Sequence, residues 1–379
     1  MQNVDALHGV NVQGCRVRQG RLVDFMHRES LDFAVLVTRE HIEYLLGPRW
    51  DFRFEPVAVV DSSGKALIVC PDRAPESVAA DDVRTYEAKW RSTLRNDQRK
   101  ASSLVLADWL IDRSQTKRIG VEFSSFPEHL SRLFENVERV DLEPFLLQCR
   151  RRKDPDERAR LQVAIDATGR MYEVARSIVE PGITELEVFS KLQQAAVGIC
   201  GEPLTETGND YACGVRGGPA RSRRCEAGEL YILDLGPAFQ GYFADNARTL
   251  SVDRQPTDEQ FTAWKYVTSA LTIVERIGRA GVSCREIYQE VFDWLRTAPV
   301  GTWSSHLGHG IGLFPHETPH LNPSWDDRLE NGDVIAVEPA LYAPSLKCGM
   351  RIENDYLVTE TGLELLSPFP MGLVEEVTP

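Results

Sequence analysis

The chain has 379 residues, of which 42% are hydrophobic, and it carries 57 acidic against 43 basic side chains. This length is sufficient for two domains with separate cores, at roughly 150 residues per domain. The acidic balance disfavours nucleic acid and anionic membranes as partners, and no apolar run is long enough for a membrane span or a signal peptide. We therefore expect a soluble, cytoplasmic protein.

The segment from Arg16 to about Val140 alternates short apolar runs with helix-like stretches, as an α/β domain does. The predicted elements are strands at 31–38 and 118–123, a hairpin at 56–70 and a helix near 100–112. Nothing in this segment combines a nucleophile with a base or forms a phosphate-binding loop. We expect it to have an architectural or substrate-gating role.

A charged run that contains a proline, residues 150–157, marks the predicted domain boundary. Asp154 before Pro155 is typical of a helix N-terminus, and the helical pattern continues to about Val179. Thr184 with Glu187 three residues later predicts a capping box for a second helix. The chain is thus expected to divide into an N-terminal domain, residues 1–150, and a C-terminal domain, residues 151–379.

Beyond residue 228 the pattern changes towards strands. Two strand pairs are predicted, 229–236 with 242–252 and 334–341 with 350–359. A helical region at about 257–296 and a loop rich in glycine and histidine lie between them. The eight cysteines form no CxxC pair, which favours reduced core thiols over zinc knuckles or disulfides, Cys348 included.

Four acidic residues interrupt these apolar strands. Asp234 lies in ELYILDLG, where a carboxylate costs several kcal/mol unless it is paired or coordinates a metal. Asp245 follows on the returning strand of the same hairpin, and Glu338 and Glu353 repeat the situation in the second pair. Each acid taken singly fits a structural ion pair. Four ionised carboxylates that converge require cations, so together they predict a divalent metal site.

Half of the chain's eight histidines fall between residues 306 and 320. The glycines of this segment allow its backbone to approach a metal closely, and we select His309 as the candidate ligand. Carboxylate-rich sites with one imidazole suit manganese, iron, cobalt or zinc. Bridging carboxylates would hold two such ions roughly 3.5 Å apart.

At these residues the sequence resembles the pita-bread metallopeptidase superfamily, which includes creatinase, aminopeptidase P and prolidase. The resemblance is carried by DLGPAFQGYFADNART, HLGHGIGLFPHETP, VEPALY and MRIENDYLVTETG. It implies an α/β (α+β) chain, with a creatinase-type N-terminal α/β domain followed by a C-terminal pita-bread catalytic domain. It also suggests a homodimer.

The same resemblance implies two divalent metal ions, manganese first, with zinc, cobalt or iron as alternatives. The implied metal ligands are Asp234, Asp245, His309, Glu338 and Glu353, with Asp245 and Glu353 bridging both ions. Glu338 would also accept the proton of a metal-bridging water, and His316 would contact the substrate carbonyl or the tetrahedral intermediate. His306 and Arg351 would support the site from outside the ligand set.

One departure from the superfamily concerns the substrate. Its active peptidases carry another histidine upstream of the first ligand strand, where this chain reads CGVRGGPARSRRCEAGEL and has none. Arg216, Arg221, Arg223 and Arg224 occupy this segment instead. They form either a solvated basic loop or, for Arg216, Arg221 and Arg223, a site for a substrate carboxylate, to which guanidinium geometry is suited.

The leading expectation is metal-dependent hydrolysis of an amide C–N bond by an Xaa-Pro aminopeptidase or a dipeptidase-like enzyme acting on a small peptide. The alternative is a non-peptidase relative, an amidohydrolase or lyase of a small acidic metabolite, which the arginine-rich loop favours. A non-catalytic binding scaffold is the third hypothesis. The five intact ligands argue against it, because a scaffold has no need for buried acids that only a cation neutralises.

Overall fold

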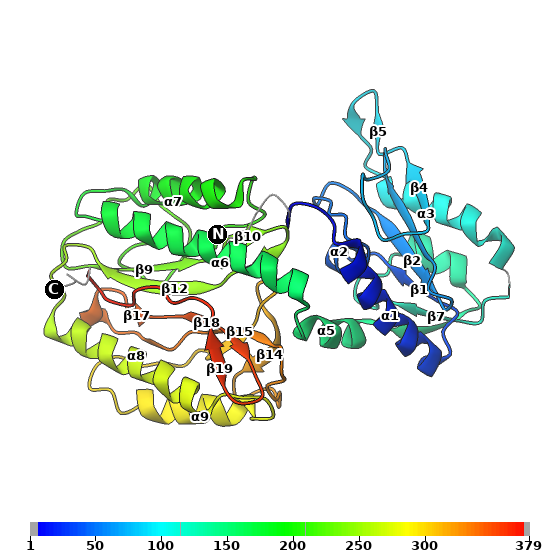
Figure 1. Cartoon of the computed structure of the whole chain (residues 1–379). Helices are drawn as coiled ribbons and strands as arrows, with labels where there is room; N and C mark the ends of the chain where they lie inside the picture. Colours follow the sequence, from blue (N-terminus) through cyan, green and yellow to red (C-terminus); the bar gives the residue numbers. More distant parts are fainter. Residues whose placement is uncertain (1–6, 114, 209, 375–379) are drawn as a thin grey trace. The chain divides into compact units, whose positions relative to one another are not determined.

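The computed structural model describes residues 7–113, 115–208 and 210–374. The chain forms two compact units, one ending at Arg150 and the other beginning at Arg151. Both mix helices with strands (Figure 1). No helix within the described residues combines the length and the apolar character that crossing a membrane requires.

The first unit is built on a six-stranded sheet with the order β4-β3-β2-β1-β7-β8. Its strands are β1 Phe33–Leu36, β2 Val57–Asp61, β3 Ala66–Pro71, β4 Asp82–Tyr86, β7 Arg118–Val121 and β8 Glu138–Asp141. The pairs β1–β2 and β2–β3 are antiparallel, whereas β3–β4, β1–β7 and β7–β8 are parallel. The hairpin expected at 56–70 is confirmed, and Asp61 Oδ1 accepts the N–H groups of Ser63 and Lys65 in its turn.

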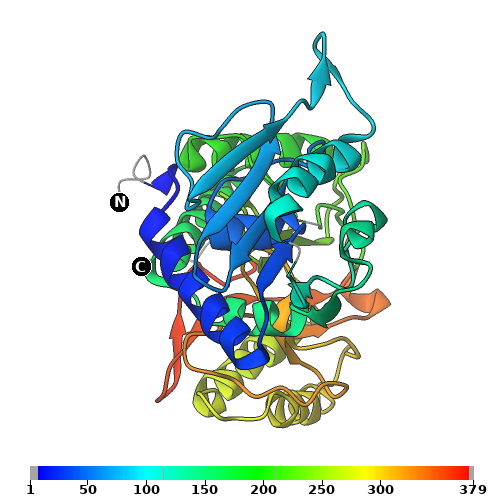
Figure 2. The ribbon, with the colours of Figure 1, turned by 90° about the vertical axis from the view of Figure 1, so that its right-hand side faces the viewer.

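The helices of this unit are α1 Val12–Glu29, α2 Arg39–Leu46, α3 Gln98–Leu110, α4 Glu128–Ser131 and α5 Glu143–Arg151, with 3-10 turns at Ile111–Arg113 and Arg132–Phe134. Strands β5 Lys89–Trp90 and β6 Thr93–Leu94 form a separate two-stranded ribbon. This ribbon projects away from the six-stranded sheet, as the cyan hairpin in Figure 2 shows. None of these elements carries a residue of the expected metal site.

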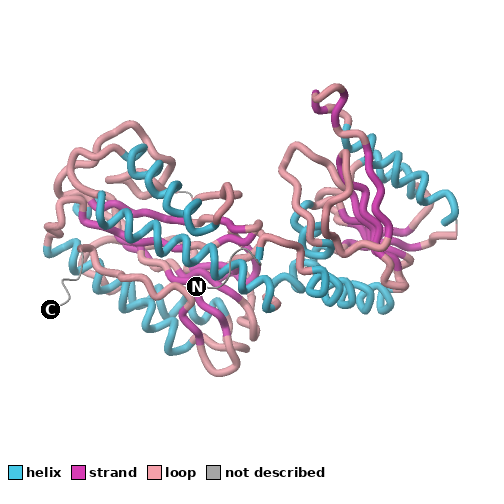
Figure 3. The backbone as a smooth tube through the Cα atoms, turned by 45° about the horizontal axis from the view of Figure 1, so that its top comes forward, coloured by secondary structure: helices cyan, strands magenta, loops and turns pink. Residues whose placement is uncertain are grey.

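Four long helices frame the second unit: α6 Pro155–Ile178, α7 Glu185–Cys200, α8 Asp258–Ile277 and α9 Cys284–Leu295. The two predicted helix starts are confirmed, because Asp154 N–H donates to Glu157 at 2.9 Å and Thr184 N–H donates to Glu187 at 2.8 Å. Helices α6 and α7 lie on one side of the strands and α8 and α9 on the other, with the strands between them in Figure 3.

The strands of this unit are β9 Leu230–Leu235, β10 Ala238–Phe239, β11 Tyr242–Phe243, β12 Asn246–Ser251, β13 Gly308–Gly310, β14 Glu317–Leu321, β15 Val334–Val337, β16 Ala340–Leu341, β17 Met350–Arg351, β18 Asn354–Val358 and β19 Leu363–Leu365, with a 3-10 turn at Pro344–Leu346. A five-stranded antiparallel sheet has the order β14-β13-β15-β18-β19, and the pairs β9–β12, β10–β11 and β16–β17 accompany it.

Three expected strands are each broken in two, at 244–245, 338–339 and 352–353. The breaks occur where the backbone changes partner: β15 and β18 pair with each other in the large sheet, whereas the adjoining β16 and β17 form a pair of their own. Glu338 N–H donates to Leu307 O at 2.8 Å, and Glu353 N–H donates to Ala247 O at 2.9 Å. The expectation of continuous strands was therefore wrong at these acids.

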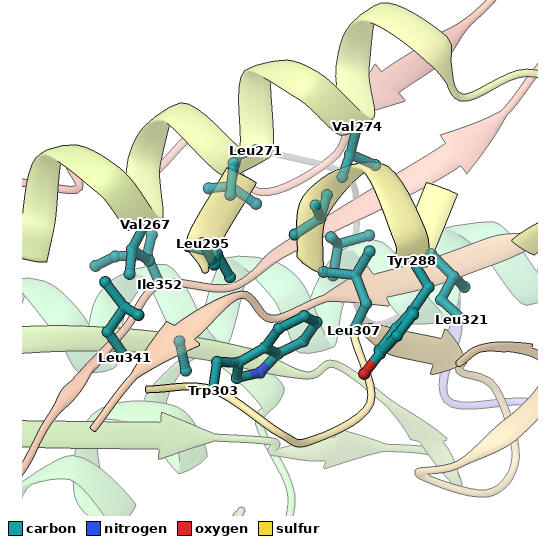
Figure 4. Packing of buried hydrophobic residues seen from close by; sticks show 14 of the residues in the cluster. Val267, Leu271, Val274, Tyr288, Leu295, Trp303, Leu307, Leu321, Leu341 and Ile352 are labelled. Atoms are coloured by element: carbon teal, nitrogen blue, oxygen red, sulfur yellow. The ribbon is translucent and has the colours of Figure 1, made fainter. Parts of the chain in front are cut away.

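A hydrophobic core joins α8 and α9 to the strands of this unit (Figure 4). Leu271 of α8 is 1% exposed and Tyr288 of α9 is 7% exposed. The Tyr288 ring lies 5.2 Å from the ring of Trp303. The cluster also contains Leu341, in β16 after the break at 338–339, and Ile352, within the break at 352–353. The core thus fixes the backbone from which Glu338 and Glu353 project. All eight cysteines are free thiols and six are buried, as expected.

Candidate metal centre

The four acids of the expected site come from two neighbouring strand pairs. Asp234 lies in β9, and Asp245 immediately precedes β12, which pairs with β9 so that Asn246 lies opposite Leu235. The Asp234 and Asp245 carboxyl groups interact electrostatically, and burial together with the charge of Asp234 raises the pKa of Asp245. Glu338 follows β15, and Glu353 precedes its antiparallel partner β18. The structure therefore brings the carboxyl groups together from segments about a hundred residues apart in sequence.

His309 occupies the middle of β13, between β14 and β15, and is 2% exposed. Its Nε2 atom lies 3.6 Å from Asp245 Oδ2 and 3.7 Å from Glu338 Oε1. Its Nδ1 lies 3.1 Å from Gly310 O, a carbonyl that can only accept, so Nδ1 carries the proton. Burial lowers the pKa of His309 to about 3. The neutral ring therefore directs the Nε2 lone pair at the carboxylates, as a metal ligand must.

Glycines on both sides of His309 permit this placement. A Cβ atom on Gly308 would collide with Ala336 O of β15, and one on Gly310 would collide with Thr318 O of β14. Strand β13 therefore fits between its neighbours only because its flanking residues lack side chains.

Burial makes the carboxylates costly to ionise without a cation. It raises the pKa of Asp234 to about 6, and together with the neighbouring negative charges it raises the pKa values of Asp245 and Glu353. Glu353 is 1% exposed, and its Oε2 atom has no hydrogen-bond partner among the described residues. A buried carboxylate oxygen without a hydrogen-bond partner is energetically costly, and a bound cation would compensate it.

The donor set fits divalent cations. Ligand atoms of Asp245, His309 and Glu353 lie within 4.8 Å of one another, close enough to share one ion. Carboxylate oxygens with a single imidazole are the donors that manganese, iron, cobalt and zinc accept. Asp234, which interacts electrostatically with Asp245, and Glu338, near His309, extend the same cluster.

Two further histidines line the cluster. His306 Nε2 lies 2.5 Å from Glu338 Oε1, and this hydrogen bond raises the pKa of His306. Burial opposes ionisation of Glu338, but the hydrogen bond and nearby positive charges outweigh it and lower the pKa of Glu338. The exposed His316 ring stacks on His309, with the ring centroids 3.7 Å apart. His306, His309 and His316 also place one nitrogen each within 4.8 Å of the others.

Arg351 connects the cluster to a residue that the sequence analysis missed. Its Nη2 lies 2.8 Å from Asp234 Oδ2 and also donates to Asp210, and its Nη1 donates to the Tyr342 hydroxyl at 3.3 Å. Asp210 forms an antiparallel bridge with Asp234, whose N–H donates to Asp210 O at 3.1 Å. No local pattern marks Asp210, because its position depends on a pairing with a strand distant in sequence.

A buried ion pair, also missed, supports the histidine loop. Lys153 Nζ donates to Glu317 Oε2 at 3.1 Å, with both side chains under 5% exposed. Glu317 Oε1 accepts the N–H of Phe314 at 3.1 Å, so the pair braces the turn that carries His316. Lys153 belongs to the charged run at the predicted domain boundary, but the sequence does not show that Glu317 is its partner.

The arginines of the upstream loop divide into two groups. Arg221 donates to both oxygens of Glu185, at 2.9 and 2.6 Å, and Arg223 donates to both oxygens of Glu229. Arg224 donates to a backbone carbonyl. Arg216 instead lies over the ring of Tyr342. The substrate-binding role expected for Arg221 and Arg223 stays a prediction, but their guanidinium groups already bind carboxylates of the chain.

Comparison with known families decides the wider assignment. The model of metallopeptidase family M24 matches residues 159–360, more than half of the chain. The chain belongs to metallopeptidase family M24. The model of the creatinase/prolidase N-terminal domain matches residues 18–152. The expected pita-bread superfamily and the expected fold class, a creatinase-type domain followed by a pita-bread domain, are thereby confirmed.

Relatives of this M24 chain match it over almost its whole length. An uncharacterized peptidase of Staphylococcus aureus is 26% identical over 364 residues, covering 92% of this chain and 98% of its own. The prolidase from Pyrococcus horikoshii and the X-Pro aminopeptidase from Thermotoga maritima have similar structures, with TM-scores of 0.79 and 0.80. Each is 22% identical and covers 94% of this chain and 99% of its own.

M24 metallopeptidases use divalent metals, and this chain has residue groups that can hold them. Membership thus agrees with the fit of the donor set. The assignment of individual ligands and the number and kind of ions stay predictions.

Proposed function

We propose that this M24 member is a dinuclear metal-dependent hydrolase of an amide C–N bond in small peptides, with Xaa-Pro bonds as its first substrates. The ions would be held by Asp234, Asp245, His309, Glu338 and Glu353. The observation that carries the proposal is the buried cluster of acids around the neutral His309, in which Glu353 Oε2 has no partner among the described residues. The names of the similar structures, prolidase and X-Pro aminopeptidase, support the choice of bond.

When bound, divalent ions would polarise the scissile carbonyl and lower the pKa of a water molecule, and manganese is our first choice. Glu338 is held ionised by His306 and is 12% exposed, so it can accept the proton of the attacking water. His316 is exposed beside His309 and can donate a hydrogen bond to the substrate carbonyl oxygen. Arg351 compensates the charge of Asp234.

A second candidate is an amidohydrolase or lyase that acts on a small acidic metabolite. The observation in its favour is Arg216, whose guanidinium has no carboxylate partner in the part of the chain that the structure describes. The two candidate activities would use the same metal chemistry. Their substrates would differ in the chemical groups next to the scissile bond.

The test is hydrolysis of a panel of Xaa-Pro peptides by protein reconstituted with manganese, with the metal content measured on the same sample. We expect about two ions per chain and turnover that a chelator abolishes and added manganese restores. Glu338→Gln should abolish turnover, whereas Glu364→Gln, an exposed carboxylate on β19, should not. Two bound ions without turnover of any peptide would favour the acidic metabolite, and absence of bound metal would contradict both candidates.

A further inference from the structure

Arg216 is the one arginine of the 216–224 loop that binds neither a carboxylate nor a backbone carbonyl of the described chain. The other three guanidinium groups are bound to Glu185, Glu229 and the carbonyl of Gly182. The Nη2 atom of Arg216 donates to Ser305 Oγ at 2.5 Å, and its Cζ lies 4.1 Å from the centroid of the Tyr342 ring. Its positive charge is therefore not neutralised by an acid of the described chain.

The backbone around Arg216 is fixed. Cys348 Sγ donates to Val215 O at 2.5 Å, and Asp210 Oδ1 accepts the N–H of Gly218 at 2.7 Å. A Cβ atom on Gly217 would collide with the Asp210 carboxylate. The loop can thus carry a long side chain at 216 but none at 217 without displacing Asp210.

Two short chains of contact lead from Arg216 to the metal centre. Ser305, its hydrogen-bond acceptor, directly precedes His306, which lies 2.5 Å from Glu338. On the other side, the Tyr342 hydroxyl accepts from Arg351.

Arg351 in turn lies 2.8 Å from Asp234. The exposed guanidinium is therefore separated from the acid cluster by the neighbours of His306 on one side and by Tyr342 and Arg351 on the other. Two intervening residues, Tyr342 and Arg351, separate it from Asp234.

The chemistry of this position selects an anion. A guanidinium has five N–H donors in a planar fork, and the described chain engages Arg216 through one hydrogen bond. The Tyr342 ring holds the guanidinium by a cation–π contact, which limits its rotation. A fixed planar fork with unused donors matches the two oxygens of a carboxylate.

We propose that Arg216 binds a carboxylate of the substrate and makes this chain selective for substrates with a free carboxylate near the scissile bond. The inference rests on the proposed amide hydrolysis and specifies its substrate class. A dipeptide supplies such a group at its C-terminus, and a longer or blocked peptide supplies it through an acidic side chain.

The test compares three peptides with one scissile Xaa-Pro bond: a dipeptide, its C-terminal amide, and an amide that carries an adjacent acidic side chain. In manganese-loaded wild-type protein, kcat/KM should be highest for a peptide with a carboxylate. Arg216→Ala should lower the ratio of kcat/KM for that peptide over the neutral amide by about tenfold, the loss expected for a charge-assisted hydrogen bond. Arg216→Lys should restore part of the ratio, because lysine keeps the charge without the fork.

Arg224→Ala is the matched control, since it removes an exposed arginine of the same loop and should leave the ratio unchanged. Preference for the dipeptide identifies the terminal carboxylate as the group bound, and preference for the acidic amide identifies the side chain. An equal ratio in wild-type protein and Arg216→Ala overturns the inference.

If no peptide is cleaved by the metal-loaded protein, the proposed function fails and the inference about Arg216 is decided by binding. Equilibrium titrations of wild-type protein and Arg216→Ala with the same three peptides then apply. Tighter binding of a carboxylate peptide that is lost in Arg216→Ala supports the inference. Equal affinity for acid and amide, or a preference that survives in Arg216→Ala, overturns it.

Discussion

The Nε2 atom of His306 lies 2.5 Å from Oε1 of Glu338, although the two residues are 32 positions apart. His306 is 37% exposed at its side chain, and Glu338 is 12% exposed. The hydrogen bond raises the pKa of His306 and helps to keep Glu338 ionised. A partly exposed imidazole therefore controls the charge of the acid that we propose as proton acceptor.

Replacing His306 by glutamine should lower turnover by about 10- to 100-fold with the metal content retained, because the residue orients and charges Glu338 without binding metal itself. His320→Gln is the control, since His320 belongs to the same segment but pairs with Asp327. Turnover and elemental analysis on the same preparations check this. Loss of metal in His306→Gln would instead assign His306 to the ligands.

Substitutions of the stacked residues His309 and His316 should have different effects on metal content and turnover. His309→Ala should lose bound metal and turnover together. His316→Ala should retain metal but lose about 100-fold in turnover, the scale of a missing proton or hydrogen-bond donor in the transition state. Metal content and kcat measured on both variants test this difference. Equal metal loss in the two variants would assign His316 to the metal ligands.

Metal should stabilise the protein through the same acids. With free manganese about a hundredfold above its dissociation constant, each bound ion should raise the free energy of unfolding by about 2.7 kcal/mol, and a chelator should reverse the gain. Glu353→Gln should reduce this gain and leave the metal-free protein at least as stable, because it replaces a buried carboxyl group whose raised pKa costs stability at neutral pH. Denaturant titrations with and without manganese measure both effects.

Glu364→Gln, on the exposed face of β19, is the control for that experiment and should keep the whole gain. A melting temperature that changes with neither manganese nor chelator would count against the assigned metal centre.

Glu122 should make the first unit sensitive to acid. The residue is 0% exposed, accepts the N–H groups of Val37 and Thr38, and lies 2.5 Å from His41 Nδ1. Burial opposes its ionisation, but the hydrogen bonds outweigh it and lower the pKa of Glu122 below 4.5. The stabilisation is therefore fully present above pH 4.5 and is lost as the pH falls through the lowered value.

Glu122→Gln should cost about 3 kcal/mol at neutral pH and flatten the loss of stability below pH 4.5. Urea unfolding over a pH series measures the slope. Glu128→Gln, at a side chain that is 71% exposed, should leave the slope as in the wild type. If Glu122→Gln loses stability below pH 4.5 as steeply as the wild type, other carboxyl groups cause the acid sensitivity.

Leu271→Ala should destabilise the second unit by about 2–5 kcal/mol, because it empties part of the core that fixes the broken strands. Leu186→Ala, at a leucine of α7 that is 47% exposed, should cost far less. Chemical denaturation of the metal-free proteins compares the two, and similar costs would contradict the central position of Leu271.

Local signals predicted a large part of the fold. The helix starts at Asp154 and Thr184 were predictable because a capping box lies within one turn of chain. The hairpin at 56–70 was predictable because two short apolar strands flank a turn of four residues. The breaks beside Asp245, Glu338 and Glu353 were not, since a strand ends where its partner changes, and the partner is remote in sequence.

The sequence by itself indicated the family, through the resemblance of its motifs, and the candidate donors, because a carboxylate in an apolar strand is costly unless a cation or an ion pair compensates it. Only the tertiary structure decided which groups meet. It brought Asp210 to Arg351, placed His306 against Glu338, and left Arg216 without an acidic partner among the described residues while its loop neighbours gained one. The physical reason is that charge pairing depends on distance in space, and burial sets its strength, whereas local sequence reveals neither.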